Sequence, residues 1–252
     1  MNKVFFILFL FIFPLSAGAQ LYDINNKWQA GIIGGVAFND LTDTRIRDEF
    51  GGQTGFTGGS FVEYHFNDMI QLRLELNFER RNLFSNSYSS GLREYDTSTY
   101  VCIRCYYQYD ITYTNDYLTI PFYFQYTQNQ GNFYFGARLG LYYSILMQSW
   151  NQGFEELYLD PLGIRPFQIS DIEPGLYRLH ISGETADVIN TYDSGIILGL
   201  FSKYDLGPRL TLQVDGSLWL GFAGLFENPA MVIVNNRTYM VRLGLGYKLF
   251  ME

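Results

Sequence analysis

Strict alternation of apolar and polar side chains over residues 70–81 constrains this chain more than any other feature. From residue 70 to residue 78, apolar side chains occupy every second position, namely Ile70, Leu72, Leu74, Leu76 and Phe78. The positions between them carry Gln71, Arg73, Glu75, Asn77, Glu79 and Arg81. A period of two is typical of an extended strand, because successive side chains point to opposite faces. The segment therefore predicts a β-strand with one apolar face and one charged face.

Comparable segments recur along the chain. We recognise eight, at residues 27–38, 54–66, 70–81, 116–126, 133–146, 193–204, 209–224 and 237–250. The sixth is the least regular, because Ile197 and Phe201 interrupt its alternation, and Trp219 is an exception in the seventh. In tilted strands that rise about 3.3 Å per residue, about ten to twelve residues cross the apolar band of an outer-membrane barrel. The segments have the length that such a barrel needs.

The connections between these segments alternate between long and short. The long ones span residues 39–53, 82–115, 148–192 and 225–236, and the short ones span 67–69, 127–132 and 205–208. Short turns at one end and long loops at the other are typical of outer-membrane barrels. We therefore expect an all-β fold, an eight-stranded antiparallel transmembrane β-barrel with up-and-down topology and long extracellular loops. An even strand count places both termini at the periplasmic end.

The first nineteen residues differ from the rest of the chain. Lys3 precedes an apolar run from Val4 to Leu15, which small residues follow at 17–19. This order is typical of a secretory signal peptide cleaved before Gln20, with a retained signal anchor as the alternative. The run is short for a spanning helix, which needs about 20 residues. We expect a signal peptide at 1–19 and one barrel domain at 20–252, located in the outer membrane of a Gram-negative bacterium.

The charge balance argues against nucleic acid as a partner. Without Lys3 the chain has 16 basic and 25 acidic residues, and no basic cluster. No later segment is apolar enough for a transmembrane helix, so strands must do any spanning. A soluble lipocalin-like barrel is a further alternative, which we disfavour because it would turn its charged faces to water and enclose an apolar pocket.

An eight-stranded barrel is filled by its own inward side chains. Pairing Phe66 with Ile70 across the first short turn sets Glu63 opposite Arg73 and Phe61 opposite Glu75. We expect a structural charge network in the lumen, and its members are Glu63, Arg73, Glu75, Arg138, Asp215 and Arg242. A proton or ion path is the alternative interpretation.

The second short turn allows a similar prediction. Pairing Tyr126 with Phe133 across it sets Tyr123 opposite Gly136. The tyrosine ring would then cover the bare glycine backbone.

Cys102 and Cys105 form a C-x-x-C motif in the second long connection. In a chain bound for an oxidising compartment, a local disulfide is the simplest interpretation. Free thiols, a redox site and a metal site are the alternatives. A redox site would need a helix N-terminus to lower a thiol pKa, and zinc would need about two more ligands. We expect no metal, cofactor or catalytic residue.

The third long connection, residues 148–192, is too long to be an idle loop. Its many apolar side chains indicate a lid over the barrel mouth or a partner-binding surface. It also contains His180 near Ser182 and Glu184, which leaves a lipid-hydrolysing enzyme as the alternative function. No nucleophile motif accompanies them.

Several segments resemble a known family. Residues 55–81, GFTGGSFVEYHFNDMIQLRLELNFERR, are similar to the second hairpin of the PorT-like outer-membrane β-barrel family common in Bacteroidetes. The later segments YLTIPFYFQY from Tyr117, FYFGARLGLYYS from Phe133, DSGIILGL from Asp193 and LGLGYKLF from Leu243 resemble its later strands in order.

This resemblance implies an eight-stranded barrel surrounded by outer-membrane lipid. Some members of the family serve in protein secretion, so the resemblance also implies an envelope or secretion-system protein as partner at the outer loops. It transfers no catalytic residue. The chain departs from the family pattern in its long second and third loops and in its end, Phe250-Met251-Glu252.

Overall fold

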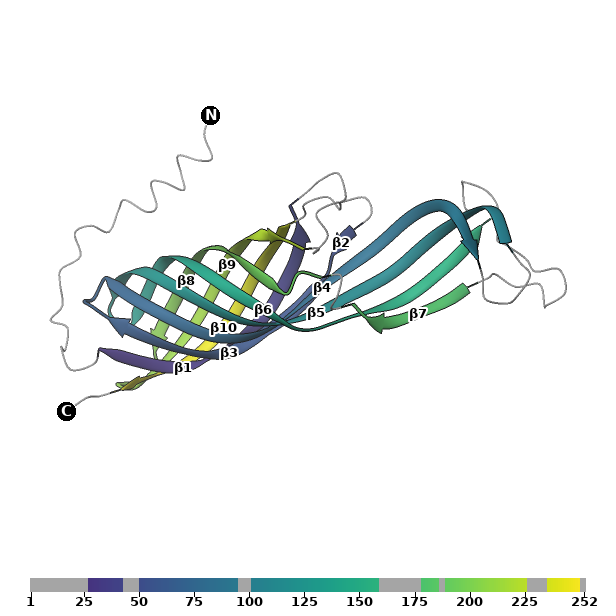
Figure 1. Cartoon of the computed structure of the whole chain (residues 1–252). Coiled ribbons are helices and arrows are strands. Elements are labelled where there is room, and N and C mark those ends of the chain that lie inside the picture. Colours follow the sequence, from purple (N-terminus) through teal and green to yellow (C-terminus); the bar gives the residue numbers. More distant parts are fainter. Residues whose placement is uncertain are drawn as a thin grey trace, which may run out of the picture.

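A computed structural model describes residues 27–42, 50–94, 101–158, 178–185, 189–225 and 235–249. The predicted signal peptide at 1–19 lies outside these residues. Figure 1 shows a barrel with a sheet that projects from one end. The strands are β1 (Trp28–Leu41), β2 (Phe50–Gly52), β3 (Thr54–His65), β4 (Ile70–Glu94), β5 (Val101–Gln130), β6 (Phe133–Tyr158), β7 (Arg178–Glu184), β8 (Tyr192–Asp205), β9 (Leu210–Gly224) and β10 (Asn235–Leu249). Within the described ranges, no helix has the length and apolarity needed to cross a membrane.

Eight of these strands close the barrel. Antiparallel pairing runs around the ring in the order β1, β3, β4, β5, β6, β8, β9, β10 and back to β1. The two short strands lie outside the ring, with β2 paired to β4 and β7 paired to β6. The predicted eight-stranded up-and-down barrel is confirmed.

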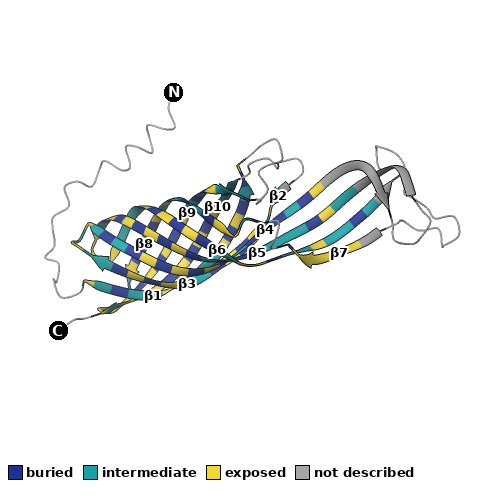
Figure 2. Ribbon diagram, in the orientation of Figure 1, coloured by how far each residue is buried: buried dark blue, intermediate teal, exposed yellow. Residues whose placement is uncertain are grey.

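Buried and exposed residues alternate along the barrel strands (Figure 2), and the two sets have opposite chemistry. On β4, Leu74 and Leu76 are about half exposed on the outside, while Arg73 and Glu75 are buried inside. The residues that interrupt the alternation, Ile197, Phe201 and Trp219, are also buried inside. The irregular positions in the sequence are thus apolar side chains of the lumen.

Aromatic side chains gather at the two edges of the apolar outer surface. At the short-turn end, the Tyr64 ring lies 4.8 Å from Trp28 and 5.0 Å from Phe66. At the other end, Phe56 lies 5.9 Å from Phe78, and Tyr143 stacks on Tyr192 at 5.8 Å. Aromatic girdles of this kind mark the two membrane interfaces of outer-membrane barrels.

Much of the second and third predicted long loops is strand instead. β4 and β5 continue as a paired hairpin up to Glu94 and Val101, and β6 continues to Tyr158, where β7 flanks it. The projecting sheet consists of residues 82–94 of β4, 101–115 of β5, 148–158 of β6 and the whole of β7. Beyond the membrane neither face of a strand has to be apolar, so the alternation that indicates the barrel strands is absent there. Within the first predicted loop, β1 extends to Leu41 and β2 is an additional short strand.

The predicted register of the first short turn is correct, and that of the second is wrong. Glu63 pairs with Arg73 and Phe61 pairs with Glu75 as expected. In the second hairpin β5 continues past Tyr126 to Gln130, which pairs with Phe133, and the chain reverses at Gly131, with a positive φ of 70°, and at residue 132.

This tighter turn changes which glycine the tyrosine covers. Tyr123 pairs with Gly140 rather than Gly136. A Cβ on Gly140 would lie 2.8 Å from the Tyr123 ring, and one on Gly136 would lie 2.8 Å from the ring of Phe201. Both glycines are therefore covered by rings, but the partner of Gly136 comes from β8.

An arginine on the outer face tests the membrane assignment. Leu243 lies on β10 midway between the exposed rings of Tyr239 and Tyr247, and Leu249 lies at the end of the strand. We expect Leu243→Arg to lower the free energy of unfolding by about 2–4 kcal/mol, and Leu249→Arg to lower it by about 0–1 kcal/mol, because the cost of a charge falls from the bilayer midplane to its edge. Urea titration in lipid vesicles measures both. Equal effects at the two positions would contradict a lipid-facing surface.

Candidate functional site

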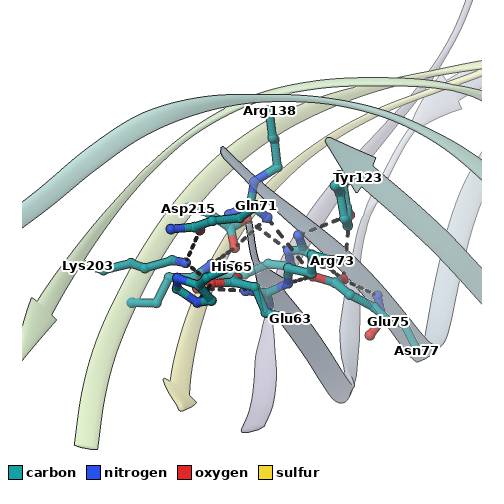
Figure 3. A network of polar contacts seen from close by, with 12 residues as sticks. Glu63, His65, Gln71, Arg73, Glu75, Asn77, Tyr123, Arg138, Lys203 and Asp215 are labelled. Atoms are coloured by element: carbon teal, nitrogen blue, oxygen red, sulfur yellow. Dashed lines mark hydrogen bonds and ion pairs between the residues drawn. The ribbon is translucent and has the colours of Figure 1, made fainter. Parts of the chain in front are cut away.

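The carboxylate of Glu75 is at the centre of a charged network inside the barrel (Figure 3). Arg73 Nε lies 2.6 Å from Glu75 Oε1, and Arg242 Nη1 lies 2.7 Å from Oε2. Asn77 Nδ2 also donates to Oε2, at 2.8 Å. The Glu75 and arginine side chains are fully buried. Their charges are therefore compensated by one another and not by solvent.

Asp215 continues this network across the lumen. Arg242 Nε donates to its Oδ1 at 2.9 Å, and Gln213 Nε2 donates to its Oδ2 at 3.1 Å. Arg138 Nη1 lies 3.4 Å from Oδ2. Arg242 thus bridges carboxylates from β4 and β9, which lie on opposite sides of the ring. One side chain links the two halves of the barrel wall.

Glu63 forms the part of the network nearest the short turns. Lys203 Nζ lies 2.5 Å from its Oε1, and His65 Nε2 lies 2.9 Å from the same oxygen. Arg73 Nη1 lies 3.5 Å from Oε2. Lys203 also donates to Gln71 Oε1 at 2.9 Å. The contacts through Arg73 join this part to Glu75.

The structure brings together all the lumen residues that the sequence suggested. These are Glu63, Arg73, Glu75, Arg138, Asp215 and Arg242, and with Lys203 we call them the lumen charge network. Sequence reasoning missed Lys203, which lies on the irregular strand β8. The alternation of β8 contains the signal for Lys203, because Gly199, Phe201 and Lys203 occupy every second position and therefore share the inward face.

An apolar layer lies beyond this network, towards the projecting sheet. It is built from Ala37, Tyr123, Tyr142, Ile197, Trp219 and Met240, all of them buried. On β10, Met240 of this layer separates Arg242 from Asn236. The rings of Tyr142 and Trp219 pack at 5.0 Å between centroids. The layer places apolar side chains between two polar levels of the interior.

A second polar cluster lies above the apolar layer. Arg81 Nη1 lies 2.5 Å from Asp193 Oδ2, and Arg81 Nη2 lies 2.8 Å from Glu79 Oε2. Tyr142 Oη and Asn236 Nδ2 both donate to Asp193 Oδ2, at 3.0 and 3.2 Å. The phenol of Tyr142 thus belongs to this cluster while its ring belongs to the apolar layer. Tyr142 therefore contacts both the polar cluster and the apolar layer.

The mouth of the barrel is closed by residues that follow β7. Ile189 is 1% exposed and packs with Leu41, Leu83 and Leu225. Backbone hydrogen bonds hold the segment on both sides, from Asn190 N to Leu225 O at 2.8 Å and from Leu146 N to the carbonyl of residue 191 at 2.8 Å. This end of the predicted third loop covers the lumen, whereas the rest of the described loop forms strands of the projecting sheet.

A polar junction fixes the projecting sheet to the barrel wall. Arg80 Nε and Nη2 donate to the two carboxylate oxygens of Asp116 at 2.7 and 2.8 Å. The Trp150 ring lies 5.0 Å from the Arg80 guanidinium. Ser149 Oγ donates to Asn115 Oδ1 at 2.7 Å and lies 2.7 Å from Thr185 Oγ1. The sheet is therefore a continuation of the barrel strands with its own side-chain contacts at the base.

The residues behind the enzyme alternative lie on β7, at the outer edge of the projecting sheet. His180 pairs with Phe154, and the two rings meet edge to face at 5.3 Å. His180, Ser182 and Glu184 are exposed on one face of the strand. Alternate residues on a strand are separated by about 6.6 Å, so the backbone alone does not bring these side chains into hydrogen-bond contact.

Both cysteines lie on β5 and not in an irregular loop. Cys105 pairs with Gly91 and Cys102 pairs with Arg93, with a bulge between the two pairs. Their side chains lie outside the described residues, so the disulfide stays a prediction. Among the residues whose side chains are described, no group of three or more His, Cys, Asp or Glu could hold a metal ion.

The sequence profile of one protein family covers most of the chain. It is the outer membrane protein beta-barrel domain, and it matches residues 18–227. The chain belongs to this family. It is therefore an outer-membrane β-barrel protein. No curated protein sequence matches it.

Solved structures of other outer-membrane barrels are similar to this outer-membrane β-barrel protein. Ail, the attachment invasion locus protein of Yersinia pestis, is 13% identical, with 88% of this chain and 99% of Ail covered and a TM-score of 0.39. OprG of Pseudomonas aeruginosa is 12% identical, with 90% and 98% covered and a TM-score of 0.43. Neisserial surface protein A is 14% identical, with 88% and 97% covered and a TM-score of 0.38. At these values the likeness carries no argument about function.

Removing the arginine that bridges the barrel should be far more costly than removing one at its rim. Arg242→Met removes one of the two short arginine contacts of Glu75 and the shortest contact of Asp215, all in a fully buried site, and we expect a loss of about 3–5 kcal/mol. Arg237→Met removes a partly exposed pair with Asp40, and we expect about 0–1 kcal/mol. Urea unfolding of the two variants in detergent measures the difference. A loss below 1 kcal/mol for Arg242→Met would show that the network does not hold the barrel together.

The apolar layer predicts a barrel that does not conduct ions. In planar lipid bilayers we expect the wild-type protein to show no steady open-channel current. The double variant Tyr142→Ala with Trp219→Ala removes the two packed rings and should admit water and ions. Steady current through the wild-type protein would disprove the closed lumen.

Proposed function

We propose that this protein is a non-enzymatic outer-membrane anchor whose projecting sheet binds a protein partner of the envelope or of a secretion system. The closed, side-chain-filled barrel supports the anchoring role, since its apolar layer leaves no path for a solute. The family assignment places the barrel in the outer membrane. Binding then falls to the part of the protein that leaves the membrane.

The observation that carries the proposal is the construction of the projecting sheet. Three barrel strands continue beyond the barrel and β7 flanks them, and residues 82–94 of β4 alone extend roughly 40 Å at about 3.3 Å per residue. The Arg80–Asp116 contacts and the serine and threonine contacts at its base fix the sheet to the barrel wall. A surface held in this way loses little conformational freedom when a partner binds, which favours affinity.

The outer edge of the sheet suits a protein partner. β7 pairs with β6 on one side, and its other side faces no strand of the described chain. An exposed strand edge presents backbone donors and acceptors that an extended segment of another protein can pair with. Ser182, Gly183 and Glu184 are all exposed along this edge.

The direction of the barrel in the membrane follows from this role. The described ends of β1 and β10 pair at the short-turn end, Trp28 with Leu249. We propose that this end faces the periplasm and that the projecting sheet faces outward. The resemblance to the PorT-like family of Bacteroidetes supports a secretion-system partner among the envelope proteins.

Site-specific photo-crosslinking in intact cells tests where the partner binds. A photo-reactive residue at Gln152, which is exposed on the projecting sheet, should crosslink to one defined envelope protein. The same residue at Asn129, exposed at the short-turn end, is the matched control and should not crosslink to that protein. Crosslinks to it from Asn129 alone would contradict the proposal.

A second variant removes the outer part of the projecting sheet and keeps its base and the barrel. Residues 87–109 and 153–181 are each replaced by Asn-Gly, which joins the paired residues Asn86 and Asp110 and the pair Gln152 and Ser182 by type I′ turns. We expect heat-modifiable migration to be retained, since the barrel is intact, and co-purification of the crosslinked partner to be lost. Full retention of the partner by a folded variant would exclude the removed part of the sheet as its binding surface.

A further inference from the structure

One side of the Arg138 guanidinium has no partner among the described side chains. Its side chain is fully buried, and only Nη1 approaches carboxylates, 3.4 Å from Asp215 Oδ2 and 4.0 Å from Glu75 Oε1. The Nε and Nη2 groups, which share the opposite edge, are both buried without a hydrogen-bond partner. Buried donors in native proteins are almost always paired. This edge therefore calls for an acceptor.

Other arginines of this protein show what such an edge binds. Arg80 Nε and Nη2 donate to the two oxygens of Asp116 at 2.7 and 2.8 Å. Arg81 Nε and Nη2 donate to Glu79 Oε2 at 3.2 and 2.8 Å. The parallel donors of a guanidinium match a planar oxyanion, which accepts both at once. The edge of Arg138 has the same shape and has no carboxylate beside it among the described residues.

The charge around Arg138 is also incomplete. The lumen charge network has four cations and three carboxylates, which leaves one positive charge in a buried site. The second cluster has one excess negative charge, from Glu79 and Asp193 against Arg81. The apolar layer separates the two clusters, so that remote charge provides no acceptor for Arg138. A single anion beside Arg138 would neutralise the excess positive charge of the lumen charge network.

Neighbouring side chains add further unused donors. Gln125 pairs with Arg138 across β5 and β6, is fully buried, and has no partner for either amide atom. Arg73 Nη2 is likewise unpaired, and Arg73 Nε contacts the same Glu75 oxygen that Arg138 Nη1 approaches. A rotation of Gln125 could offer its oxygen to one donor of Arg138. It would leave the positive charge uncompensated.

We infer that the lumen holds one small, singly charged oxyanion, of the size of nitrate, formate or bicarbonate, on the Nε–Nη2 edge of Arg138. The amide of Gln125 lies next to this edge in register and supplies a further donor. Since the surrounding charged side chains are at most 3% exposed, the anion enters when the barrel closes and stays as part of its interior. Its role is to complete the charge balance of the anchor, so the inference does not depend on any partner of the projecting sheet.

Refolding at constant ionic strength tests this inference. The barrel is titrated with urea in detergent while nitrate replaces gluconate, which is too large for a closed lumen. For a single site, the folding equilibrium constant rises in proportion to nitrate once the concentration exceeds the dissociation constant, close to tenfold for each tenfold increase. We expect this dependence in the wild-type protein. A dependence near zero would overturn the inference, because a water molecule at the edge would give that result.

Two variants assign the effect to the proposed edge. Arg138→Gln removes the edge and the charge and should abolish the nitrate dependence. Arg80→Gln removes an arginine whose edge Asp116 already occupies, and it should keep the dependence at a lower overall stability. An unchanged dependence in Arg138→Gln would place the anion elsewhere and refute the assignment.

A crystallographic measurement decides the matter even where Arg138→Gln does not fold. The wild-type protein is refolded and crystallised in bromide, whose anomalous scattering identifies it. We expect an anomalous peak within hydrogen-bond distance of Arg138 Nε and Nη2. Density at that edge without an anomalous signal would indicate water and would overturn the inference.

Discussion

The requirement that every backbone hydrogen bond be made inside the protein governs this structure. Within a bilayer an unpaired N–H or C=O group costs several kcal/mol, so strands can cross only as a closed ring. Pairing of β1 with β10 completes that ring. Closure then creates an inside and an outside, and the period of two in each strand distributes side chains between lipid and lumen. The charged faces enter the lumen because no other place in the membrane accepts them.

The lumen solves the resulting electrostatic problem in layers. The lumen charge network lies at one level and the Arg81 cluster at another, with six apolar or aromatic side chains between them. Each charged layer is held mainly by short contacts across the ring, which also tie distant strands together. The intervening rings pack between the two polar layers. An interior of this kind suits an anchor better than a pore.

The sequence predicted the parts of the fold that the membrane constrains. The eight strands, the first hairpin register and six members of the lumen charge network all follow from alternation, because lipid permits only one phase of each strand. Lys203 was missed where Ile197 and Phe201 disturb that phase. The predicted register of the second hairpin was wrong because the length of the polar turn at Gly131 does not affect which face of each strand is apolar. Alternation therefore does not determine where this turn lies.

The projecting sheet lay beyond the reach of the same reasoning for a physical reason. Outside the membrane both faces of a strand can meet water, so its sequence carries no obligatory alternation, and residues 82–115 and 148–192 look like loops. In the function proposed above, these unconstrained segments bind the partner, whereas the constrained ones build the anchor. The alternation is thus strongest in the barrel strands, which many outer-membrane proteins share, and weakest in the projecting sheet. Binding to a partner therefore has to be measured at positions of the projecting sheet and compared with positions of the barrel.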